Sequence, residues 1–447
     1  MKRSPKRPAA IILPVALFLA LVPALLAAAA DPADIVSFDR RHFESRGLVR
    51  DGLDLLYEKG GRVYAVVSPE EIASLVSRGV PFTIETARFA PSAGPAASAA
   101  GGLNGAFHSA YELDTELRLL AAAHPQLVRL QEIGTSLEGR PIQALKISDN
   151  PGLDEGEPAV LFLGCHHARE WISVEVPLLL ARHLLESYAL DPEVRSLVDR
   201  GEIWIVPLVN PDGLEYSIHV YRYWRKNRRA NSDGTFGVDL NRNYGYQWGY
   251  DNVGSSPVPG SAVYRGTAPF SEPETEAVRR LFLSRDFRAM VSFHSFSQLI
   301  LYPWGYVDLP TAKEAELSTL AQAMSSLMAA ARGTIYVPGR ASASLYTTNG
   351  DTADWTFGVS GVPSFTVELP PEDTAGGGFF NAEAEIEAIF RENLPALLYL
   401  TNYAFLSSPD GGIRPRLPGT LRRSPPRLPL IKRIDRDVPC AINTIRH

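Results

Sequence analysis

The sequence predicts an α/β fold in which a central mixed, largely parallel, twisted sheet is flanked by helices and is preceded by a small α/β unit. Between residues 106 and 406, helical segments alternate with short apolar runs such as AVLFL at 159–163 and EIWIVPLV at 202–209. Apolar runs of this kind are typical of central strands that are covered on both faces. A separate strand–helix–strand pattern at 31–89 predicts the small preceding unit.

The composition is that of an ordinary globular protein. The chain has 447 residues, of which 45% are hydrophobic and 21% charged, and its formal net charge is −6. This length is typical of one large domain with a smaller one, or of two medium domains, and the mildly acidic balance gives no support for a nucleic-acid partner. The two cysteines, Cys165 and Cys440, cannot form a disulfide framework. We interpret Cys165 as a small buried hydrophobic residue.

The N-terminus resembles an export signal over residues 1–30. The basic segment MKRSPKR precedes an apolar run at 9–30, which ends in small residues before Asp31. The run is also long enough to span a bilayer, so an uncleaved anchor is the alternative. Pro14, Pro23 and the alanine-rich end favour cleavage. We therefore expect a secreted or periplasmic protein with no membrane segment in its mature form.

The small N-terminal unit has the pattern of two strands around one helix. Strands are predicted at 60–68 and 81–89, and a helix at 68–79. Ser68 can cap that helix, and Glu71 completes a capping box three residues later. The local sequence thus specifies where the helix begins.

Composition changes mark the other boundaries. Residues 90–105 are rich in Ala, Gly, Pro and Ser, and predict a linker before the main domain at 106–406. A periodic stretch at 382–405 predicts a helix that closes this domain. The tail at 407–447 is rich in Pro and Arg without helical or strand periodicity, so we expect a disordered extension. A surface-binding or sorting role for the tail is the alternative.

Side chains that can bind metal lie at the ends of three predicted strands. HHARE at 166–170 follows the run AVLFL, His294 follows AMVSF at 289–293, and Glu368 lies near the end of SFTVEL at 364–369. Because the carboxyl ends of such strands meet at one edge of a sheet, these imidazoles and carboxylates should lie close together. A catalytic zinc site needs such ligands with one position left for water.

The spacing of His167 and Glu170 is compatible with a shared ion. Residues three apart are about one helical turn apart and can converge on one point. On the residues alone, His166 could be the ligand instead. His167 and His294 could also be core histidines that are hydrogen bonded to the backbone.

Seven segments occur in the order and at the separations seen in one enzyme family. They are HHAREW (166–171), NPDG (210–213), YWRKNRR (223–229), VDLNRNY (238–244), SFHSFSQLILYPWGY (292–306), LYTTNGDTADW (345–355) and FTVEL (365–369). Through them, residues 106–406 resemble the zinc metallocarboxypeptidases of the carboxypeptidase A and B type, and in particular the bacterial carboxypeptidase T branch. The resemblance implies a protease that hydrolyses the C-terminal peptide bond of peptides and proteins.

The resemblance also implies the metal site and the base. His167, Glu170 and His294 would hold a single Zn²⁺ ion. Asp239 would orient the His167 ring. Glu368 would act as general base on the attacking water and later pass the proton to the leaving amine.

Further residues are implied as substrate contacts. Arg225 would stabilise the oxyanion. Asn241 and Arg242 would bind the terminal carboxylate of the substrate, for which a planar guanidinium is well suited. Tyr346 would close the pocket, and Arg169 would contact the substrate further from the cut bond.

The expected specificity is broad. Ala353 stands where relatives specific for basic residues have aspartate, which argues against a strict Lys or Arg preference. Asp351 is expected to face the same pocket, as in the carboxypeptidase T branch, and Ala341 leaves room. We expect hydrophobic terminal residues to be accepted and basic ones tolerated. Phe296 replaces a tyrosine of many relatives, which puts one extended-substrate contact in doubt.

The unit at 31–89 resembles the prosegments of such enzymes, which can cover the active site, so we expect a zymogen. The linker has no Lys or Arg, which argues against activation by a trypsin-like cut. The expected partners are peptide or protein C-termini, and we expect a monomer.

Two other interpretations compete with this one. A relative that acts on bacterial wall peptides would share the zinc and the base, but Asn241, Arg242 and Tyr346 suit an ordinary α-carboxylate. A non-catalytic binding module on the same fold would typically have lost a ligand or the base, and this chain keeps them all.

Overall fold

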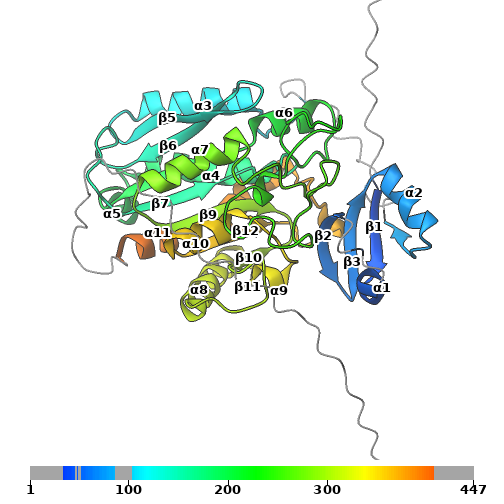
Figure 1. Cartoon of the computed structure of the whole chain (residues 1–447). Helices are drawn as coiled ribbons and strands as arrows, with labels where there is room; N and C mark the ends of the chain where they lie inside the picture. Colours follow the sequence, from blue (N-terminus) through cyan, green and yellow to red (C-terminus); the bar gives the residue numbers. More distant parts are fainter. Residues whose placement is uncertain (1–33, 46–47, 49–51, 86–102, 407–447) are drawn as a thin grey trace, which may run out of the picture.

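The computed structural model describes residues 34–45, 48, 52–85 and 103–406 (Figure 1). The predicted export signal at 1–30, most of the linker at 90–105 and the tail at 407–447 lie outside the described residues.

The N-terminal unit is a four-stranded antiparallel sheet with two helices (Figure 1). The strand order is β2-β3-β1-β4. The elements are β1 (Asp34–Asp39), α1 (Arg40–Ser45), β2 (Asp54–Lys59), β3 (Arg62–Val67), α2 (Pro69–Ser77) and β4 (Thr83–Ile84). The predicted capping box is present, since Ser68 accepts from the Glu71 N–H and Glu71 accepts from the Ser68 N–H. The predicted strand at 81–89 is represented in the described residues only by the short β4.

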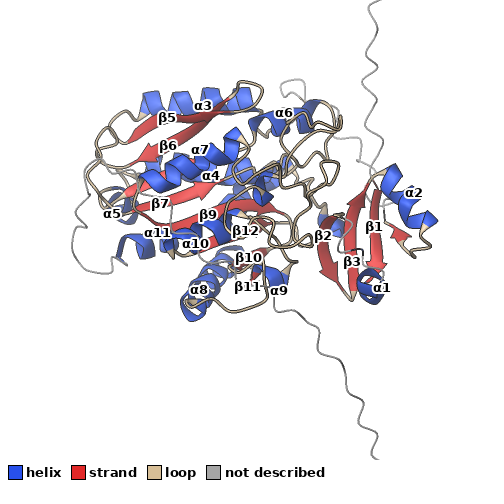
Figure 2. Ribbon diagram, viewed as in Figure 1, coloured by secondary structure: helices blue, strands red, loops and turns tan. Residues whose placement is uncertain are grey.

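The larger unit is built on an eight-stranded mixed sheet in the order β11-β10-β12-β9-β7-β8-β6-β5 (Figure 2). Its strands are β5 (Val128–Thr135), β6 (Pro141–Ile147), β7 (Ala159–Leu163), β8 (Glu202–Val206), β9 (Phe287–Ser295), β10 (Leu299–Tyr302), β11 (Val337–Arg340) and β12 (Ser364–Leu369). The central strands β12, β9, β7 and β8 run parallel, while β10 and β6 run antiparallel to their inner neighbours. The predicted mixed α/β sheet is confirmed.

Helices cover both faces of this sheet (Figure 2). They are α3 (Ala110–Ala123), α4 (Ile172–Ser187), α5 (Pro192–Val198), α6 (Pro211–His219), α7 (Pro273–Ser284), α8 (Glu314–Arg332), α9 (Ala341–Ser344), α10 (Thr352–Ser360) and α11 (Ile386–Leu406). Strand β7 is buried on both faces, which explains its wholly apolar sequence. Val160 and Phe162 pack in the core beneath α4 and α11, and Leu161 and Leu163 pack in the core beneath α7. Among the described helices, none has the length and apolar character needed to cross a membrane.

Strand register brings distant parts of the chain to one sheet edge. Glu368 on β12 lies directly opposite His294 on β9, and Leu163 at the end of β7 lies opposite Ser292. Residues that follow β7 therefore emerge beside His294. The sheet thus creates the meeting point that the sequence pattern predicted.

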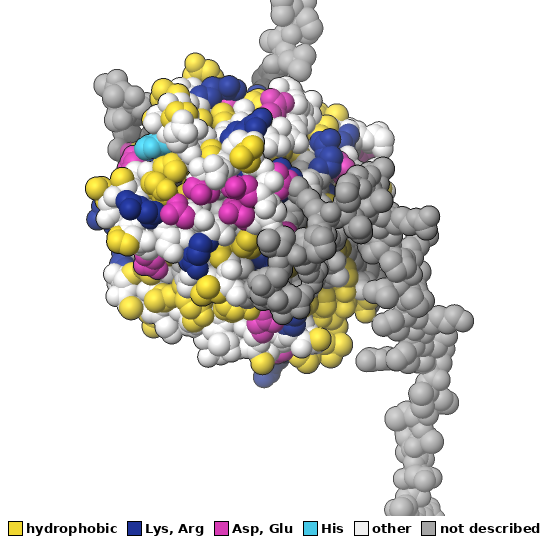
Figure 3. All heavy atoms as spheres, turned by 90° about the vertical axis from the view of Figure 1, so that its left-hand side faces the viewer, with side chains coloured by type: hydrophobic (Ala, Val, Ile, Leu, Met, Phe, Trp, Pro, Cys, Tyr) yellow, Lys and Arg dark blue, Asp and Glu magenta, His cyan; other side chains and the backbone are white. Residues whose placement is uncertain are grey.

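The N-terminal unit contacts the larger unit through β2 (Figure 1). Asp54 forms a bidentate ion pair with Arg169, with Oδ1 2.8 Å from Nη2. The Tyr57 hydroxyl lies 2.6 Å from that of Thr374, and the Tyr57 ring packs on Phe296 at a centroid distance of 5.8 Å. The contact therefore falls on segments next to the strand ends that carry His294 and Glu368. On the side of the molecule away from this unit, Figure 3 shows charged side chains of both signs intermixed with apolar ones.

Candidate active site

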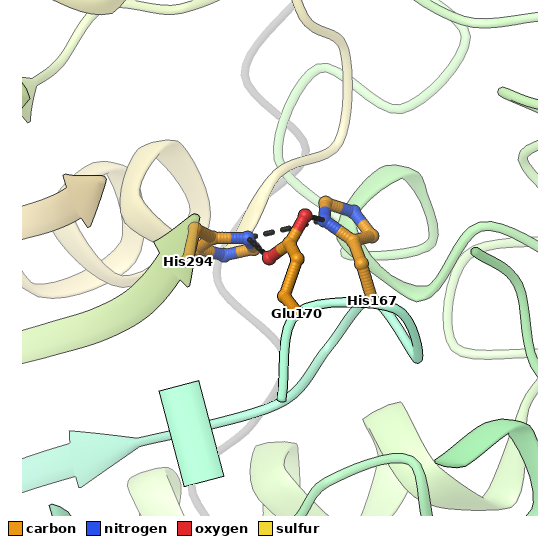
Figure 4. Close-up of side chains that lie close together, drawn as sticks. All are labelled: His167, Glu170 and His294. Carbon is orange, nitrogen blue, oxygen red and sulfur yellow. Dashed lines mark hydrogen bonds and ion pairs between the residues drawn. The ribbon is translucent and has the colours of Figure 1, made fainter. Parts of the chain in front are cut away.

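Three side chains converge at the carboxyl ends of β7 and β9 (Figure 4). His167 Nδ1 lies 2.9 Å from Glu170 Oε1, and His294 Nδ1 lies 3.0 Å from Glu170 Oε2. The two imidazole Nδ1 atoms are 3.1 Å apart. The structure therefore brings together the three residues that the resemblance names as zinc ligands, and it selects His167 rather than His166 for this cluster.

The local chain geometry explains this convergence. Glu170 lies two positions before Ile172, the first residue of α4, and its Oε2 accepts from the Ser295 N–H at 3.2 Å. Gly164 lets the turn after β7 pass very close to its neighbours, because a Cβ there would lie 2.2 Å from the Ser173 carbonyl oxygen. A larger residue at this position would push the ligand-bearing turn away from the sheet.

The donor set fits a zinc ion. Two imidazoles and a carboxylate are a ligand combination that zinc uses, with a further position left open in catalytic sites. All three side chains are buried. Although burial opposes it, the neighbouring imidazoles of His167 and His294 lower the pKa of Glu170, so that this carboxyl is ionised as a metal ligand must be.

Asp239 links the metal site to Arg225. Its Oδ1 lies 3.2 Å from His167 Nε2, and its Oδ2 accepts from Arg225 Nε at 3.1 Å. The carboxylate is fully buried, and despite that burial Arg225 holds its pKa well below the usual range. Asp239 also begins the short 3-10 helix η3 (Leu240–Arg242), since Oδ1 accepts from the Asn241 N–H at 2.9 Å. One carboxylate thus orients a ligand ring, a guanidinium and the following turn.

The remaining predicted groups line one cavity with the metal-site histidines. Arg242 is fixed by bonds from Nη1 to the Asn241 carbonyl at 2.8 Å and from Nε to the Gly254 carbonyl at 3.0 Å. Its guanidinium carbon lies 6.0 Å from the centre of the Tyr346 ring. The cavity is lined by His167, Arg225, Asn241, Arg242, His294, Tyr346 and Glu368, among others. Donors for an anion and a candidate base therefore line the same cavity.

Glu368 is a buried carboxyl with no fixed cation partner at hydrogen-bond distance among the described residues. Burial raises its pKa to about 8, and the Glu170 carboxylate acts in the same direction while His294 opposes it. A carboxyl with a raised pKa is suited to accept and return a proton near neutral pH.

Residues of α9 and of the start of α10 also line the cavity. They are Ala341, Asp351 and Ala353. The Asp351 carboxyl is held by Thr348, whose hydroxyl lies 2.5 Å from Oδ2, and by the Asp354 N–H at 2.8 Å. Burial raises the pKa of Asp351. As the sequence predicts, Asp351 and Ala353 lie in the same cavity.

Arg169 is placed differently from the other predicted contacts. Its side chain is 1% exposed and pairs with Asp54 of the N-terminal unit, and it is not among the residues that line the cavity. Because Arg169 lies between His167 and Glu170 in the sequence, its backbone is nevertheless next to the metal site.

Sequence reasoning missed a set of hydroxyl groups behind the metal site. Ser292 Oγ lies 3.0 Å from His294 Nε2, and the Thr352 hydroxyl donates to Asn241 Oδ1 at 2.7 Å. One signal was available: Ser292 is a polar residue two positions before His294 in a buried strand, and residues two apart point to the same face.

Comparison with known proteins agrees with this geometry. A sequence profile of the zinc carboxypeptidase family matches residues 113–396. A zinc carboxypeptidase of Saccharothrix mutabilis subsp. capreolus is 33% identical over 432 residues, which are 90% of this chain and 97% of that protein. Carboxypeptidase A1 of Rattus norvegicus is 34% identical over 300 residues, which are 66% of this chain and 70% of that protein. The crystal structure of a carboxypeptidase A from Helicoverpa armigera has a TM-score of 0.72 at 27% identity and covers 85% of this chain and 98% of its own.

A mixed sheet whose strand ends gather two imidazoles and a carboxylate around one point defines a metal-dependent hydrolase. The chain belongs to the zinc carboxypeptidase family. It is accordingly a metallocarboxypeptidase that uses one Zn²⁺ ion, and its substrates are peptides.

Proposed function

We propose that this metallocarboxypeptidase holds its zinc ion with His167, Glu170 and His294 and uses Glu368 as its general base. The observation that carries the proposal is the strand register, because Glu368 lies directly opposite His294 and lines the same cavity. The three ligand atoms lie within 4.8 Å of one another. A base and a metal site on neighbouring strands can act on the same water molecule.

The chemistry follows from the poor reactivity of an amide toward water. When bound, the zinc ion supplies Lewis acidity, which polarises a carbonyl and makes a water molecule more acidic. Glu368 takes a proton from the attacking water and later delivers it to the leaving amine. Arg225, whose guanidinium is paired with the Asp239 carboxylate at 3.0 Å, donates to the oxyanion that develops on the scissile carbonyl.

Asn241, Arg242 and Tyr346 bind the free carboxylate of the substrate in this proposal. An amide donor and a guanidinium beside the cut bond match the charge and planarity of a terminal carboxylate. The Arg242 guanidinium is already held by two backbone carbonyls, so little ordering is needed on binding. Such a clamp explains why the enzyme removes one C-terminal residue instead of cutting within a chain.

A Glu368→Gln variant tests the assignment of the base. The variant should bind one zinc ion per chain, as the parent protein does, and should lose about 10²–10⁴-fold in kcat. Metal analysis and peptide turnover with and without a chelator measure the two effects separately. Glu383→Gln, on the exposed 3-10 turn before α11, serves as the matched control. A zinc-loaded Glu368→Gln enzyme that cleaves at the parental rate would show that the base is wrongly assigned.

We propose a broad preference that covers hydrophobic and, to a lesser degree, basic terminal residues, as in the bacterial carboxypeptidase T branch. Ala341 and Ala353 leave apolar space in the cavity, and Asp351 offers a carboxyl to a terminal Lys or Arg. Turnover of peptides that differ only in a terminal Phe, Leu, Lys, Arg or Glu measures this preference. A preference for terminal Glu would contradict it, since Asp351 would repel that side chain.

We also propose that the chain is exported by its signal at 1–30 and kept latent by the unit at 31–89. Support comes from β2, which places Asp54 on Arg169 and Tyr57 against Phe296, two residues after His294. Mass spectrometry of the secreted protein should find a mature N-terminus within the linker at 90–105. A secreted enzyme that retains Asp54 and works at full rate would contradict latency.

A further inference from the structure

His166 precedes a zinc-binding residue in the sequence, yet its ring faces a different set of groups. The side chain is fully buried. Its Nδ1 lies 3.1 Å from the Ser292 hydroxyl. Its Nε2 lies 2.8 Å from the Tyr244 hydroxyl and 3.2 Å from the Thr352 hydroxyl. His166 is therefore outside the donor cluster of the metal site, and the chemistry proposed above does not use it.

One side of this ring reaches His294 through Ser292. The Ser292 hydroxyl oxygen lies 3.0 Å from His294 Nε2. A metal ligand must offer a lone pair, and His294 directs Nδ1 toward Glu170 and His167, so its proton sits on Nε2 and is donated to Ser292. The Ser292 hydroxyl then has its own proton to give, and His166 Nδ1 accepts it.

The other side of the ring reaches Asn241 through Thr352. Since Nδ1 is an acceptor, His166 carries its proton on Nε2 and donates it to the hydroxyl oxygens of Tyr244 or Thr352. Thr352 donates its hydroxyl proton to Asn241 Oδ1 at 2.7 Å and its backbone N–H to the same oxygen at 2.9 Å. These bonds decide which end of the amide is the donor, and they leave Nδ2 on the side of His294, 3.5 Å from its Nε2.

We propose that His166 is a positioning residue whose single neutral tautomer sets both His294 for zinc and the Asn241 amide for the substrate carboxylate. The inference rests on the roles proposed above for His294 and Asn241. With its proton on Nδ1 instead, the ring would no longer accept the Ser292 hydroxyl proton, and its Nε2 lone pair would compete with Asn241 Oδ1 for the Thr352 hydroxyl proton. The ring also lies nearly parallel to that of His294, at 11° and a centroid distance of 5.6 Å, which restricts reorientation.

Two isosteric variants separate the two sides of the ring. In His166→Asn the amide oxygen can replace Nδ1 as acceptor, but no group replaces the Nε2 donor. In His166→Gln the amide nitrogen can replace the Nε2 donor, but the acceptor for Ser292 is lost. We expect His166→Gln to bind zinc about 10–100-fold more weakly with an almost unchanged KM. We expect His166→Asn to bind zinc like the parent protein and to show a KM raised about 10-fold.

Zinc affinity is measured on the full-length protein by competition with a chromophoric chelator, and KM on the zinc-saturated enzyme after removal of the N-terminal unit. Thermal unfolding reports whether each variant folds. Parental protein that fails to bind zinc or to cleave peptides would refute the proposed function itself. If the parental protein binds zinc and cleaves peptides, the variants test the positioning role alone. That role is refuted if His166→Asn and His166→Gln each change zinc affinity and KM together, or change neither.

Two further variants keep the test decisive if the His166 variants do not fold. Ser292→Ala removes the link to His294 and should weaken zinc binding without raising KM. Thr352→Val removes the link to Asn241 and should raise KM without weakening zinc binding. Thr356→Val, one turn further along α10, is the matched control, because this buried hydroxyl bonds to the Ser364 hydroxyl and to the Thr352 and Ala353 carbonyls and not to the Asn241 amide. Equal effects from Ser292→Ala and Thr352→Val on both quantities would overturn the proposal.

Discussion

Asp239 shows how one buried carboxylate can control several groups at once. It touches the His167 ring, the Arg225 guanidinium and the Asn241 N–H, and it is inaccessible to solvent. Arg225 in turn has Asp239 as its hydrogen-bonded ion-pair partner. Removal of the Asp239 charge would therefore loosen the His167 ring and leave the Arg225 guanidinium without this ion-pair partner.

We expect Asp239→Asn to weaken zinc binding by about 10–100-fold, because a neutral amide holds the His167 ring less strongly than a carboxylate does. Chelator competition measures the change. Asp233→Asn, at an exposed aspartate on the preceding loop whose carboxylate accepts from Thr235, should leave the affinity unchanged. Equal affinity in Asp239→Asn and the parent protein would show that this contact does not orient the ligand.

The residues of the site could be predicted from the sequence to a large extent, but their surroundings could not. Strand-terminal positions and the His-x-x-Glu spacing predicted a metal site at this sheet edge, and the resemblance to the zinc carboxypeptidases named His167, Glu170 and His294 as its ligands. The choice between His166 and His167 needed coordinates, because adjacent residues in a turn can face opposite sides. The partner of Arg169 also needed coordinates, since Asp54 lies 115 residues away in the chain.

At the scale of single elements, α7 carries an unusual first turn. Glu274 is fully buried there, and its Oε2 accepts from Asn227 Nδ2 at 3.3 Å. Burial raises the pKa of Glu274 to about 7, and the nearby Glu272 carboxylate adds to this effect. The fold therefore favours the protonated carboxyl.

The sign of the resulting pH effect follows from linkage. A carboxyl whose pKa is raised by folding contributes stability below its unfolded pKa of about 4.5 and loses that contribution as the pH rises through 7. We expect Glu274→Gln to raise the free energy of unfolding by about 2 kcal/mol at pH 8 and by almost nothing near pH 4.5. Denaturant unfolding at several pH values measures this. Glu276→Gln, a half-buried neighbour paired with Arg279, should give no comparable pH-dependent gain.

The elements that the sequence specified best are the central strands and the capped helices. Strands β7, β8, β9 and β12 are wholly or almost wholly buried, so their sequences read as apolar runs. In the edge strand β5 only Val128 is buried, and the other positions are half-buried or exposed and include charged residues, so its sequence is not an apolar run. Whether a segment becomes an edge strand depends on packing against the neighbouring strand more than on the composition of the segment itself.

At the scale of the whole molecule, the two units meet on segments next to the strand ends that carry His294 and Glu368. Asp54 supplies both carboxylate oxygens to a guanidinium that is almost fully buried. Lys59 adds a more exposed contact to Asp373 at 2.5 Å. A buried charge that loses its partner is far more costly than an exposed one. The Asp54 pair should therefore dominate the electrostatic part of the contact.

We expect Asp54→Asn to raise the peptide turnover of the full-length chain at least 10-fold toward that of the processed enzyme, because loss of one partner of a buried pair costs about 3–5 kcal/mol. Initial rates before and after removal of the N-terminal unit measure the gain. Glu70→Gln, on the exposed side of α2, is the control and should stay latent. If Asp54→Asn is as inactive as the parent chain before processing, this ion pair does not hold the unit in place.

The pairing of Glu368 with His294 has a consequence for how such an enzyme can be re-engineered. Both residues occupy one rung of a parallel ladder, so their separation is fixed by the spacing between neighbouring strands, about 4.8 Å. The stretch from 296 to 363 connects β9 to β12 and includes Ala341, Asp351 and Ala353, which line the cavity. Replacing this stretch with the corresponding stretch of a relative should alter which terminal residues are accepted, while Glu368 and His294 keep their positions relative to each other.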